Sequence, residues 1–334
     1  MPAAPARLVE DYDDRAAWNA FVRAHPHGHL FQTCEWGELQ DGLGGHPRRI
    51  AAVGDHGIVG VIQFLVFDTG ARTFAYVPRG PVCDPDDAAL GGRLIEAALV
   101  AGHAAGADFF RLEPQWPFTE ARAERLLARG WSPTPQSIML PRTILVDLQP
   151  EPDVIWSRFR SNTRNRIRLA EKLGVEVRAG GADDVASFIR LAGETAARHA
   201  LRRDAAQYDL AWQHFGASGD LRLYLASADG IDVAGVMVFT CGANATYVWG
   251  ASAGSPEARR LNPNQLLHWT AMRWARGRGC TTYDMHGIPD HDESVLEAEY
   301  GRQAGGTWNL YRFKRGFGGR VHRHLGTYDW RFRL

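Results

Sequence analysis

Two stretches of this sequence decide its fold, and they are similar to each other. The first, Arg48 to Val82, reads RRIAAVGDHGIVGVIQFLVFDTGARTFAYVPRGPV, and the second, Leu221 to Ala253, reads LRLYLASADGIDVAGVMVFTCGANATYVWGASA. Each contains three β-rich runs separated by short turns, and the second run of each carries Gly-Val near its start. Turn residues between β-branched runs predict antiparallel hairpins. Each stretch is therefore predicted to form a three-stranded meander.

The similarity continues beyond the two meanders. A helical pattern of apolar residues follows each meander and ends at a glycine, Gly106 in the first copy and Gly279 in the second. A further β-rich run follows each glycine. Gly60 and Gly235, at equivalent places in the meanders, are 175 positions apart, and the two helix-ending glycines are 173 apart. These near-equal offsets predict an internal duplication of one β-meander–α–β unit.

A length of 334 residues suits two domains. We predict an α/β (α+β) chain of two tandem domains, each a mixed, mostly antiparallel sheet flanked by helices. A polar, proline-containing stretch at 147–153 predicts the boundary, giving a first domain over 1–150 and a second over 151–319. Between the meanders, residues 154–218 are mostly helical in pattern.

Composition excludes several classes of protein. Lys and Arg number 38, as do Asp and Glu, so the formal net charge is +0 and a globally basic nucleic-acid coat is excluded. The four cysteines lie far apart without a CxxC pair, which argues against a disulfide scaffold or a zinc ribbon. We see no signal peptide and no apolar run near the ~20 residues that span a bilayer. We therefore expect a cytoplasmic protein.

Two stretches, 156–173 and 302–333, are locally basic. The first contains six basic residues and one acid, Glu171; the second contains eight basic residues and one acid, Asp329, with aromatic residues between them. Basic side chains interleaved with stacking rings suit phosphate backbones and unpaired bases. The alternative is that these arginines are ordinary surface residues of an arginine-rich sequence and that the aromatic residues pack in the core.

Lysine is almost absent from the sequence. Only Lys172 and Lys314 occur, so the other 36 of the 38 basic residues are arginines. A lysine that persists against this background marks a place where a compact ammonium is needed and a planar guanidinium is unsuitable, unless it persists by chance.

No familiar catalytic or metal motif is readable. His25, His27 and His29 have metal-ligand side chains, but a loop of this composition is more often solvated, so we predict no metal site. His286 lies two residues after Asp284 and could relay protons, although a structural histidine is the commoner case. There is no Walker A motif and no GxGxxG after a strand. Gly91-Gly92, which opens a predicted helix, is a weak anion-binding signal.

Five phrases in order carry a family resemblance. They are FQTCEWG at 31–37, YVPRGPV at 76–82, RNRIRLAEK at 164–172, YDMHGI at 283–288 and YRFKRGFG at 311–318. Together they resemble the FemABX family of peptidyltransferases, which pass amino acids from aminoacyl-tRNA to peptidoglycan precursors. The resemblance implies two domains like those of acyl-CoA N-acyltransferases (GNAT-like), with the C-terminal tail, about 320–334, packing on the first. The long arm of some members is absent, as in the compact FemX-like branch.

The resemblance also implies roles for individual residues. The family's catalytic Phe-Lys pair falls on Phe313 and Lys314, where an ammonium could stabilise the oxyanion formed when an amine attacks an ester. The implied substrate-binding positions are Trp36, Gln40, Glu113, Arg203, Asp204, Tyr208, Tyr247 and Trp249. The candidates for tRNA binding are Arg312, Arg315, Arg164, Arg166 and Arg168.

Three implied positions depart from the family pattern. Gln40 stands where the family has a lysine, Asp204 where it has an arginine, and Trp249 where it has a tyrosine. The missing lysine and arginine would contact the diphosphate of a nucleotide-linked precursor. Their replacement leaves room for a lipid-linked acceptor or a different one.

The resemblance leads us to expect an aminoacyltransferase that moves an amino acid from aminoacyl-tRNA, its co-substrate, to an amine of a peptide, chiefly the stem peptide of lipid II. It would need no cofactor, act as a monomer, and visit the inner face of the membrane transiently. Three alternatives are a tRNA-dependent enzyme of peptide-antibiotic synthesis, an acyl-CoA N-acyltransferase, and an RNA-binding protein without catalysis.

Overall fold

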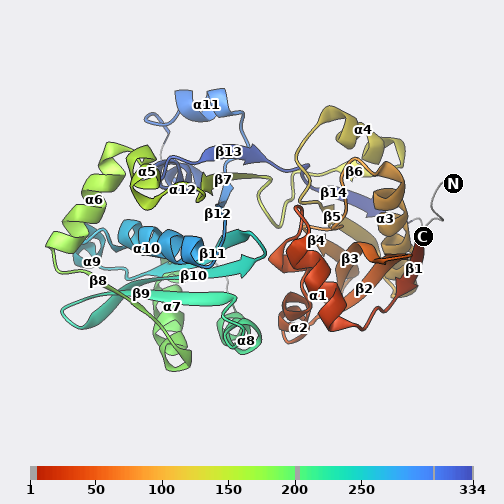
Figure 1. Ribbon diagram of the computed structural model, residues 1–334, viewed down its shortest axis with the longest axis horizontal. Coiled ribbons are helices and arrows are strands. Elements are labelled where there is room, and N and C mark those ends of the chain that lie inside the picture. The colour runs from red at the N-terminus through yellow and green to blue at the C-terminus, as the bar shows by residue number, and fades with distance from the viewer. Residues whose placement is uncertain (1–5, 200–203, 304, 333–334) are drawn as a thin grey trace. The chain divides into compact units, whose positions relative to one another are not determined.

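The computed structural model describes residues 6–199, 204–303 and 305–332. The chain divides into two compact units (Figure 1). The first comprises the residues up to Pro141 together with those from Arg323 onward, and the second comprises Arg142–His322. Each unit contains one mixed sheet flanked by helices, as the sequence predicts.

The first unit contains a seven-stranded sheet. In spatial order its strands are β1 (Arg7–Glu10), β2 (Gly45–Gly54), β3 (Gly57–Asp68), β4 (Thr73–Pro78), β5 (Phe109–Glu113), β14 (Tyr328–Arg331) and β6 (Ser132–Pro133). Its helices are α1 (Arg15–Ala24), η1 (Leu30–Gln32), α2 (Cys34–Asp41), α3 (Ala88–Ala104) and α4 (Glu120–Ala128). Strand β14 comes from the end of the chain and pairs antiparallel with β5, so the C-terminal segment completes the first sheet.

The second unit also contains a seven-stranded sheet. In spatial order its strands are β13 (Arg320–Arg323), β7 (Arg142–Asp147), β12 (Thr282–Ile288), β11 (Asn244–Ser252), β10 (Ile231–Cys241), β9 (Leu221–Ala228) and β8 (Glu176–Ala179). Its helices are α5 (Pro152–Arg158), α6 (Ser161–Lys172), η2 (Ala182–Asp184), α7 (Val185–His199), α8 (Ala206–Phe215), α9 (Pro256–Arg260), α10 (Pro263–Gly277), α11 (Glu293–Ala298) and α12 (Gly306–Arg315).

The duplicated unit is present in both sheets. Strands β2–β3–β4 and β9–β10–β11 form antiparallel meanders, and the strand after the following helix pairs parallel with the last meander strand. Helices α3 and α10 also end alike: Gly106 and Gly279 have φ of 85° and 88°, which favours glycine. In both, the next residue donates its N–H to a carbonyl five residues back, Ala107 to Gly102 (3.1 Å) and Cys280 to Ala275 (3.0 Å).

The two copies differ where the parallel strands meet. In the first unit, β4 and β5 pair over five residues, from Phe74 to Pro78 on β4. In the second, β11 and β12 pair over three, from Asn244 to Thr246 on β11. The remainder of β11, to Ser252, and of β12, to Ile288, is not paired to the other strand. The second sheet therefore opens between β11 and β12, while the first is closed at the equivalent place.

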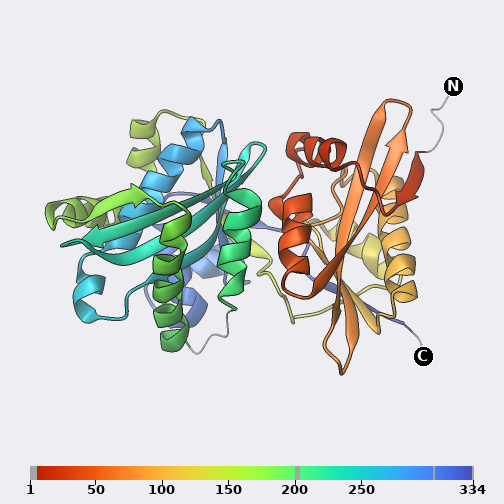
Figure 2. The ribbon, with the colours of Figure 1, turned by 90° about the horizontal axis from the view of Figure 1, so that it is seen from below.

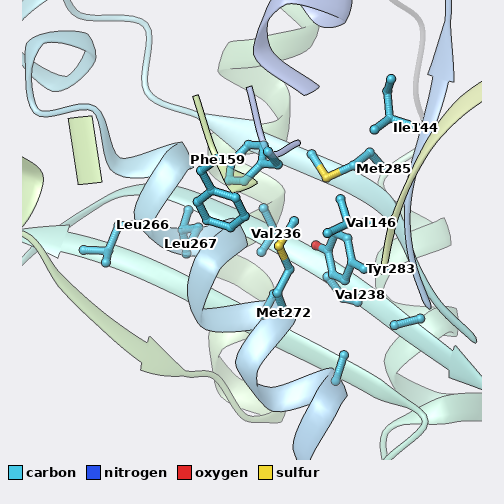
Figure 3. Packing of buried hydrophobic residues seen from close by; sticks show 14 of the residues in the cluster. Ile144, Val146, Phe159, Val236, Val238, Leu266, Leu267, Met272, Tyr283 and Met285 are labelled. Atoms are coloured by element: carbon cyan, nitrogen blue, oxygen red, sulfur yellow. The ribbon is translucent and has the colours of Figure 1, made fainter. Parts of the chain in front are cut away.

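Helices cover both faces of the second sheet (Figure 1, Figure 2). On one face, side chains of α10 pack with those of β7, β10 and β12; Figure 3 shows Leu266, Leu267 and Met272 of α10 in this cluster. On the other face, Phe239 of β10 packs edge-on against Phe215 of α8 at a centroid distance of 5.1 Å. Alternate side chains of β10 thus pack on opposite faces of the sheet, as expected for a strand buried on both faces.

The division between the units lies after Pro141, whereas the sequence places it near residue 150. Strand β7 pairs antiparallel with β12, so it belongs to the second sheet. The polar stretch at 147–153 connects β7 to α5 within the second unit. Within the described ranges, every helix is too short or too polar to cross a bilayer.

Candidate functional site

Lys314 lies in the second unit at the opening between β11 and β12. It is in the last turn of α12, and the residue is only 4% exposed. Tyr311, three residues earlier, is on the same buried face of α12 and donates its hydroxyl hydrogen to Glu297 (2.7 Å). This face of the helix therefore carries the lysine inward.

Strand β12 presents two carbonyl groups to this lysine. Lys314 Nζ donates to the carbonyl oxygens of His286 (3.0 Å) and Gly287 (2.7 Å). Carbonyls of successive residues in a regular strand point in opposite directions, so both can face one nitrogen only where the strand is irregular. The irregularity is a bulge between Asp284 and Gly287, with His286 at φ 61°. The backbone N–H of His286 donates to Asp284 Oδ1 (2.7 Å), which holds the bulge.

The buried position of Lys314 makes the charged form of its side chain less favourable than it is in water. Burial lowers the pKa of its ammonium to about 8, and the nearby carboxylate of Asp284 opposes this shift. An ammonium has three N–H donors and no acceptor. Two donate to the carbonyls of β12, and no described residue accepts a hydrogen bond from the third. One donor of a buried cation is therefore available to a substrate, which is a feature of functional sites.

Aromatic rings line the surroundings of the ammonium. The Tyr247 ring centroid lies 5.8 Å from Lys314 Nζ, and the same ring packs edge-on against His268 at 4.5 Å. His268 in turn contacts the ring of Phe313 at 5.3 Å. Burial and the Lys314 charge lower the pKa of His268 to about 3, so its ring is neutral, and its Nδ1 is 3.0 Å from the hydroxyl of Tyr283. The lysine is thus the cation of this site, and the rings exclude water around it.

We expect the reaction rate to depend on pH through the protonation state of Lys314. The pKa of its ammonium is lowered to about 8, so the group is charged below that pH and loses its charge above it. If the charged form stabilises the reacting oxygen, the rate of the aminoacyl transfer that the resemblance implies falls as pH rises through about 8. Single-turnover rates measured between pH 6.5 and 9.5, corrected for spontaneous ester hydrolysis, check this. A rate that rises steadily to pH 9.5 would contradict it.

A groove of about 190 Å³ begins beside Phe313. It lies at the start of α10 and is lined by Arg166, Val233, Ser252, Ala253, Ala258, Arg259, Asn262, Pro263, Asn264, Gln265 and Phe313. Two of these residues are arginines and none is acidic. Anything bound in the groove therefore meets the positive charge of two arginines and the ring of Phe313, the residue next to Lys314. In the described part of the chain, no group of three or more His, Cys, Asp and Glu side chains could hold a metal.

The other predicted substrate-binding residues of the second unit lie in different surroundings, and two of them, Tyr208 and Trp249, contact each other. Tyr208 is buried and packs edge-on against Trp249 at a centroid distance of 5.3 Å. Tyr247 lies two residues before Trp249 on β11, beside Lys314. Asp204 is exposed and accepts a hydrogen bond from the N–H of Ala206 (2.9 Å) at the start of α8. Arg203 lies outside the described residues. Only Tyr247 of this set is placed against the lysine.

In the first unit, Trp36 and Gln40 lie four residues apart on α2. Trp36 is buried against the Phe31 ring at 4.2 Å, and Gln40 is half-buried. Glu113 is 1% exposed at the end of β5, and its carboxylate accepts hydrogen bonds from Tyr76 Oη (2.5 Å) and Thr327 Oγ1 (2.9 Å). The N–H groups of Ile138 (2.8 Å) and Met139 (3.1 Å) also donate to it. This carboxylate therefore accepts hydrogen bonds from groups of the protein itself, and these bonds connect a loop and the C-terminal segment to β5.

We expect Glu113→Gln to destabilise the first unit. In this variant an NH₂ group, which can only donate, replaces a carboxylate oxygen that accepts hydrogen bonds from groups such as Tyr76 Oη and the N–H of Ile138. Hydrogen bonds to a charged acceptor contribute about 2 kcal/mol. The free energy of unfolding should fall by about 2 kcal/mol in urea denaturation followed by tryptophan fluorescence. Glu96→Gln, an exposed position on α3, is the control and should change little. If both variants had the same free energy of unfolding, the carboxylate of Glu113 would not stabilise the first unit.

The arginines predicted to bind tRNA have different surroundings. Arg315 is occupied by the protein, since Nε donates to Glu297 (2.5 Å) and Nη1 to the carbonyl of Gly319 (2.6 Å). Arg164 donates to backbone carbonyls at the end of α5. Arg166 and Arg168 are exposed on α6.

Arg312, like Arg164 and Arg315, is half-buried, and it donates to Asn309 on its own helix. The prediction of RNA contact therefore rests chiefly on Arg166 and Arg168, and Arg166 also lines the groove at α10.

Sequence reasoning missed three residues of this site. His268 lies on an apolar helix face, where histidine is usually structural. Asp284 lies in the YDMHGI phrase and is noted in the sequence only as a neighbour of His286, without a role of its own in the site. Gln265 lies in the first turn of α10, where glutamine is unremarkable. A signal for Asp284 was present: an aspartate two residues before a histidine and a glycine can hold a bulge, because its carboxylate accepts the next free N–H.

Comparisons with known proteins agree with this architecture. Residues 157–315 match the acetyltransferase (GNAT) domain family. The chain is 23% identical over 390 residues to the lipid II:glycine glycyltransferase of Staphylococcus aureus, covering 93% of this chain and 90% of that protein. The crystal structure of FemX superposes with a TM-score of 0.83 at 21% identity, covering 97% of both chains.

A tandem GNAT protein from the clavulanic acid biosynthesis pathway superposes with a TM-score of 0.56 at 12% identity, covering 97% of this chain and 98% of that one. The predicted fold of two tandem GNAT-like domains is confirmed.

Proposed function

Since this chain is an acyltransferase of the FemABX family, we propose that it transfers an amino acid from aminoacyl-tRNA to a peptide amine. The acceptor is the stem peptide of lipid II. The single observation that carries this proposal is the buried ammonium of Lys314, with two N–H groups held by carbonyls and the third available to a substrate.

The chemistry follows from the charge of this group. The acceptor amine attacks the carbonyl carbon of the aminoacyl ester, forming a C–N bond and a negatively charged oxygen. The third N–H of Lys314 donates to that oxygen, and a fixed donor in a water-poor site is worth about 10²–10³ in rate. The C–O bond to the ribose then breaks, and the amine proton moves to the leaving ribose oxygen through the vicinal hydroxyl of the terminal nucleotide. An ester needs no strong base from the protein, which is consistent with the neutral state of His268.

The carbonyls of β12 have a second role in this proposal. By fixing two of the three N–H directions, His286 and Gly287 leave the ammonium one direction in which to donate. Such preorganisation avoids the reorganisation that a freely rotating ammonium would need during the reaction. The Tyr247 ring beside the nitrogen favours the charged form.

The similarity to a protein named lipid II:glycine glycyltransferase supports lipid II as the acceptor. Gln40 and Asp204 stand where a nucleotide-linked precursor would meet a lysine and an arginine. These neutral and acidic side chains fit an acceptor whose diphosphate is not held at those positions, such as one presented by a membrane. The enzyme would then act at the cytoplasmic membrane face, without a cofactor, as a monomer.

An acyl-CoA-dependent reaction is the second candidate, because residues 157–315 match an acetyltransferase domain. Acyl-CoA enzymes of this fold cradle the pyrophosphate with bare backbone amides at the start of the helix equivalent to α10. Here that turn contains no glycine, and Pro263 has no N–H to donate. The start of α10 is thus poorly suited to a diphosphate, which favours the RNA donor.

Purified enzyme should be incubated with a pool of charged tRNAs and lipid II, and the products examined by mass spectrometry. We expect a lipid II stem peptide lengthened by one or more amino acid residues and release of uncharged tRNA. Transfer to another peptide but not to lipid II would indicate peptide-antibiotic synthesis. Acetylation from acetyl-CoA, with no transfer from any tRNA, would overturn the proposal.

A further inference from the structure

Helix α6 of the second unit presents two leucines to solvent. Leu169 is 42% exposed, and Leu173, at the C-cap, is 46% exposed. They are four residues apart, so their side chains are neighbours on one face of the helix. The opposite face, with Ile167 and Ala170, packs in the core of the second unit beside α10. Single exposed leucines are common on protein surfaces, whereas a neighbouring pair forms an apolar patch suited to an interaction.

Basic side chains lie on both sides of these leucines. Arg166 is three residues before Leu169 on one side, and Arg168 and Lys172, which are four residues apart, form a row on the other. All three basic residues are exposed, and in the described part of the chain no carboxylate forms an ion pair with any of them. Glu171, the acidic residue of α6, is two positions from each leucine and therefore faces away from both. The patch is thus apolar in the middle and positively charged at its sides.

This combination of side chains suits an anionic lipid bilayer better than an RNA. Bases of an RNA stack on open aromatic faces. The ring of Trp156, beside α6, is already covered by the guanidinium of Arg168, whose Cζ lies 5.5 Å from the ring centroid. Leucines add nothing to a contact with phosphates, but at a bilayer they enter the boundary between headgroups and acyl chains. Arginine and lysine side chains beside them can then reach anionic headgroups.

We propose that the exposed face of α6 docks this protein on an anionic bilayer. Leu169 and Leu173 enter the boundary between headgroups and acyl chains, while Arg166 and Arg168 contact the headgroups. The inference rests on the proposed function, because it names the surface by which the enzyme reaches a lipid-linked acceptor. Lys172 adds a cation at the edge of this face and takes no part in the transfer step.

Two properties of the face agree with this role. Arg166 also lines the groove beside Phe313, so the docked face adjoins the surroundings of Lys314. Two leucines and a few cations give weak and reversible membrane binding. An enzyme that moves from one acceptor molecule to the next needs binding of this kind.

Sedimentation with lipid vesicles tests the inference. We expect wild-type protein to bind vesicles of phosphatidylcholine mixed with phosphatidylglycerol about tenfold more tightly than vesicles of phosphatidylcholine alone. Leu169→Asn/Leu173→Asn should lower the affinity for the anionic vesicles about tenfold, because apolar surface no longer enters the bilayer. Leu127→Asn, which replaces a similarly exposed leucine on α4, should change it less than about twofold. Equal affinity of the double variant and wild type would overturn the inference.

A fluorescent label reports directly which face meets the lipid. The four natural cysteines are buried, so a cysteine introduced at the surface can be labelled selectively. We expect a polarity-sensitive fluorophore on Leu169→Cys to shift its emission to shorter wavelength when anionic vesicles are added. The same fluorophore on Val100→Cys, at a 62% exposed position of α3, should not shift. A shift at position 100 without one at position 169 would contradict docking through α6.

Transfer assays separate this inference from the proposed function. With charged tRNA, Leu169→Asn/Leu173→Asn should transfer about tenfold more slowly than wild type to lipid II in anionic vesicles. With lipid II in detergent, its rate should stay within about twofold of wild type, because no bilayer is present. Transfer by wild-type protein in detergent, without any binding to anionic vesicles, would overturn the docking face while the proposed function stands. Leucine-dependent vesicle binding with no transfer from any charged tRNA would overturn the proposed function alone. Loss of affinity for uncharged tRNA in the double variant, with vesicle binding unchanged, would assign the face to RNA and overturn the inference.

Discussion

Lys314→Met should reduce the single-turnover rate of aminoacyl transfer by about 10³-fold, while the affinity for uncharged tRNA changes less than about threefold. Methionine preserves much of the apolar stem and removes the ammonium donor that the proposal directs at the reacting oxygen. The ammonium is buried and held by two carbonyls of β12, so it is not available to the phosphates of a long RNA surface. Quench-flow measurement of the transfer rate, with filter binding of tRNA, checks both parts.

The chain offers a matched control for this variant in its only other lysine. Lys172 is exposed at the end of α6, and Lys172→Met should alter the transfer rate less than about twofold. Lys314→Arg should not restore activity, because a planar guanidinium cannot donate to both carbonyls and the substrate from one nitrogen. A parallel loss of tRNA affinity and rate in Lys314→Met would instead mean that the lysine holds phosphate, which would remove the catalytic role.

The duplication and the importance of Lys314 could be predicted from the sequence for physical reasons. Turn residues and β-branched runs determine hairpins locally, so two similar meanders are visible without knowledge of their packing. Helix-ending glycines are also local signals, and Gly106 and Gly279 both have the positive φ that such ends require. A lysine in an arginine-rich chain stands out by composition alone, and Lys314 proves to be buried.

The geometry around Lys314 could not be predicted, because it depends on contacts between distant residues. The opening between β11 and β12 is set by how far two strands pair, and the bulge by a hydrogen bond within β12 and its register with β7. For a related reason, counting charged residues in the sequence does not show which arginines are paired with carboxylates. Arg315 appears free in the sequence but is paired with Glu297, which is 18 positions away on a different helix.

The domain boundary shows the same limit. A polar, proline-containing stretch predicts a linker, and residues 147–153 do connect two elements. Which sheet the preceding strand joins is decided by its partner, and β7 pairs with β12. A local signal therefore identified a connection without showing which unit contains it.

Asp284→Ala should lower the transfer rate by about 100-fold, the cost of displacing a reacting group by about 1 Å. Asp284 is buried, and its Oδ1 accepts from the N–H of His286 and from the hydroxyl of Thr143. Without these bonds, the left-handed conformation of His286 loses its support, and the carbonyls of His286 and Gly287 no longer direct Lys314. Asp284 contacts no substrate in this view, so it is a positioning residue. Single-turnover rates at pH 6.5, where the lysine is charged, measure this effect.

Asp284→Asn separates the two contributions of this carboxylate. The amide oxygen can still accept from His286 and Thr143, so at pH 6.5 the rate should stay within about threefold of wild type. The negative charge is lost, and since that charge raises the pKa of Lys314, the pKa should fall below about 8. The decline in rate with rising pH should therefore begin at a lower pH than in wild type. Asp290→Asn, which removes a carboxylate paired with Arg142, should leave the decline where it is. Equal impairment of the Ala and Asn variants at pH 6.5, with an unshifted pH profile, would mean that Asp284 neither holds the bulge through its acceptor nor supports the charge of the lysine.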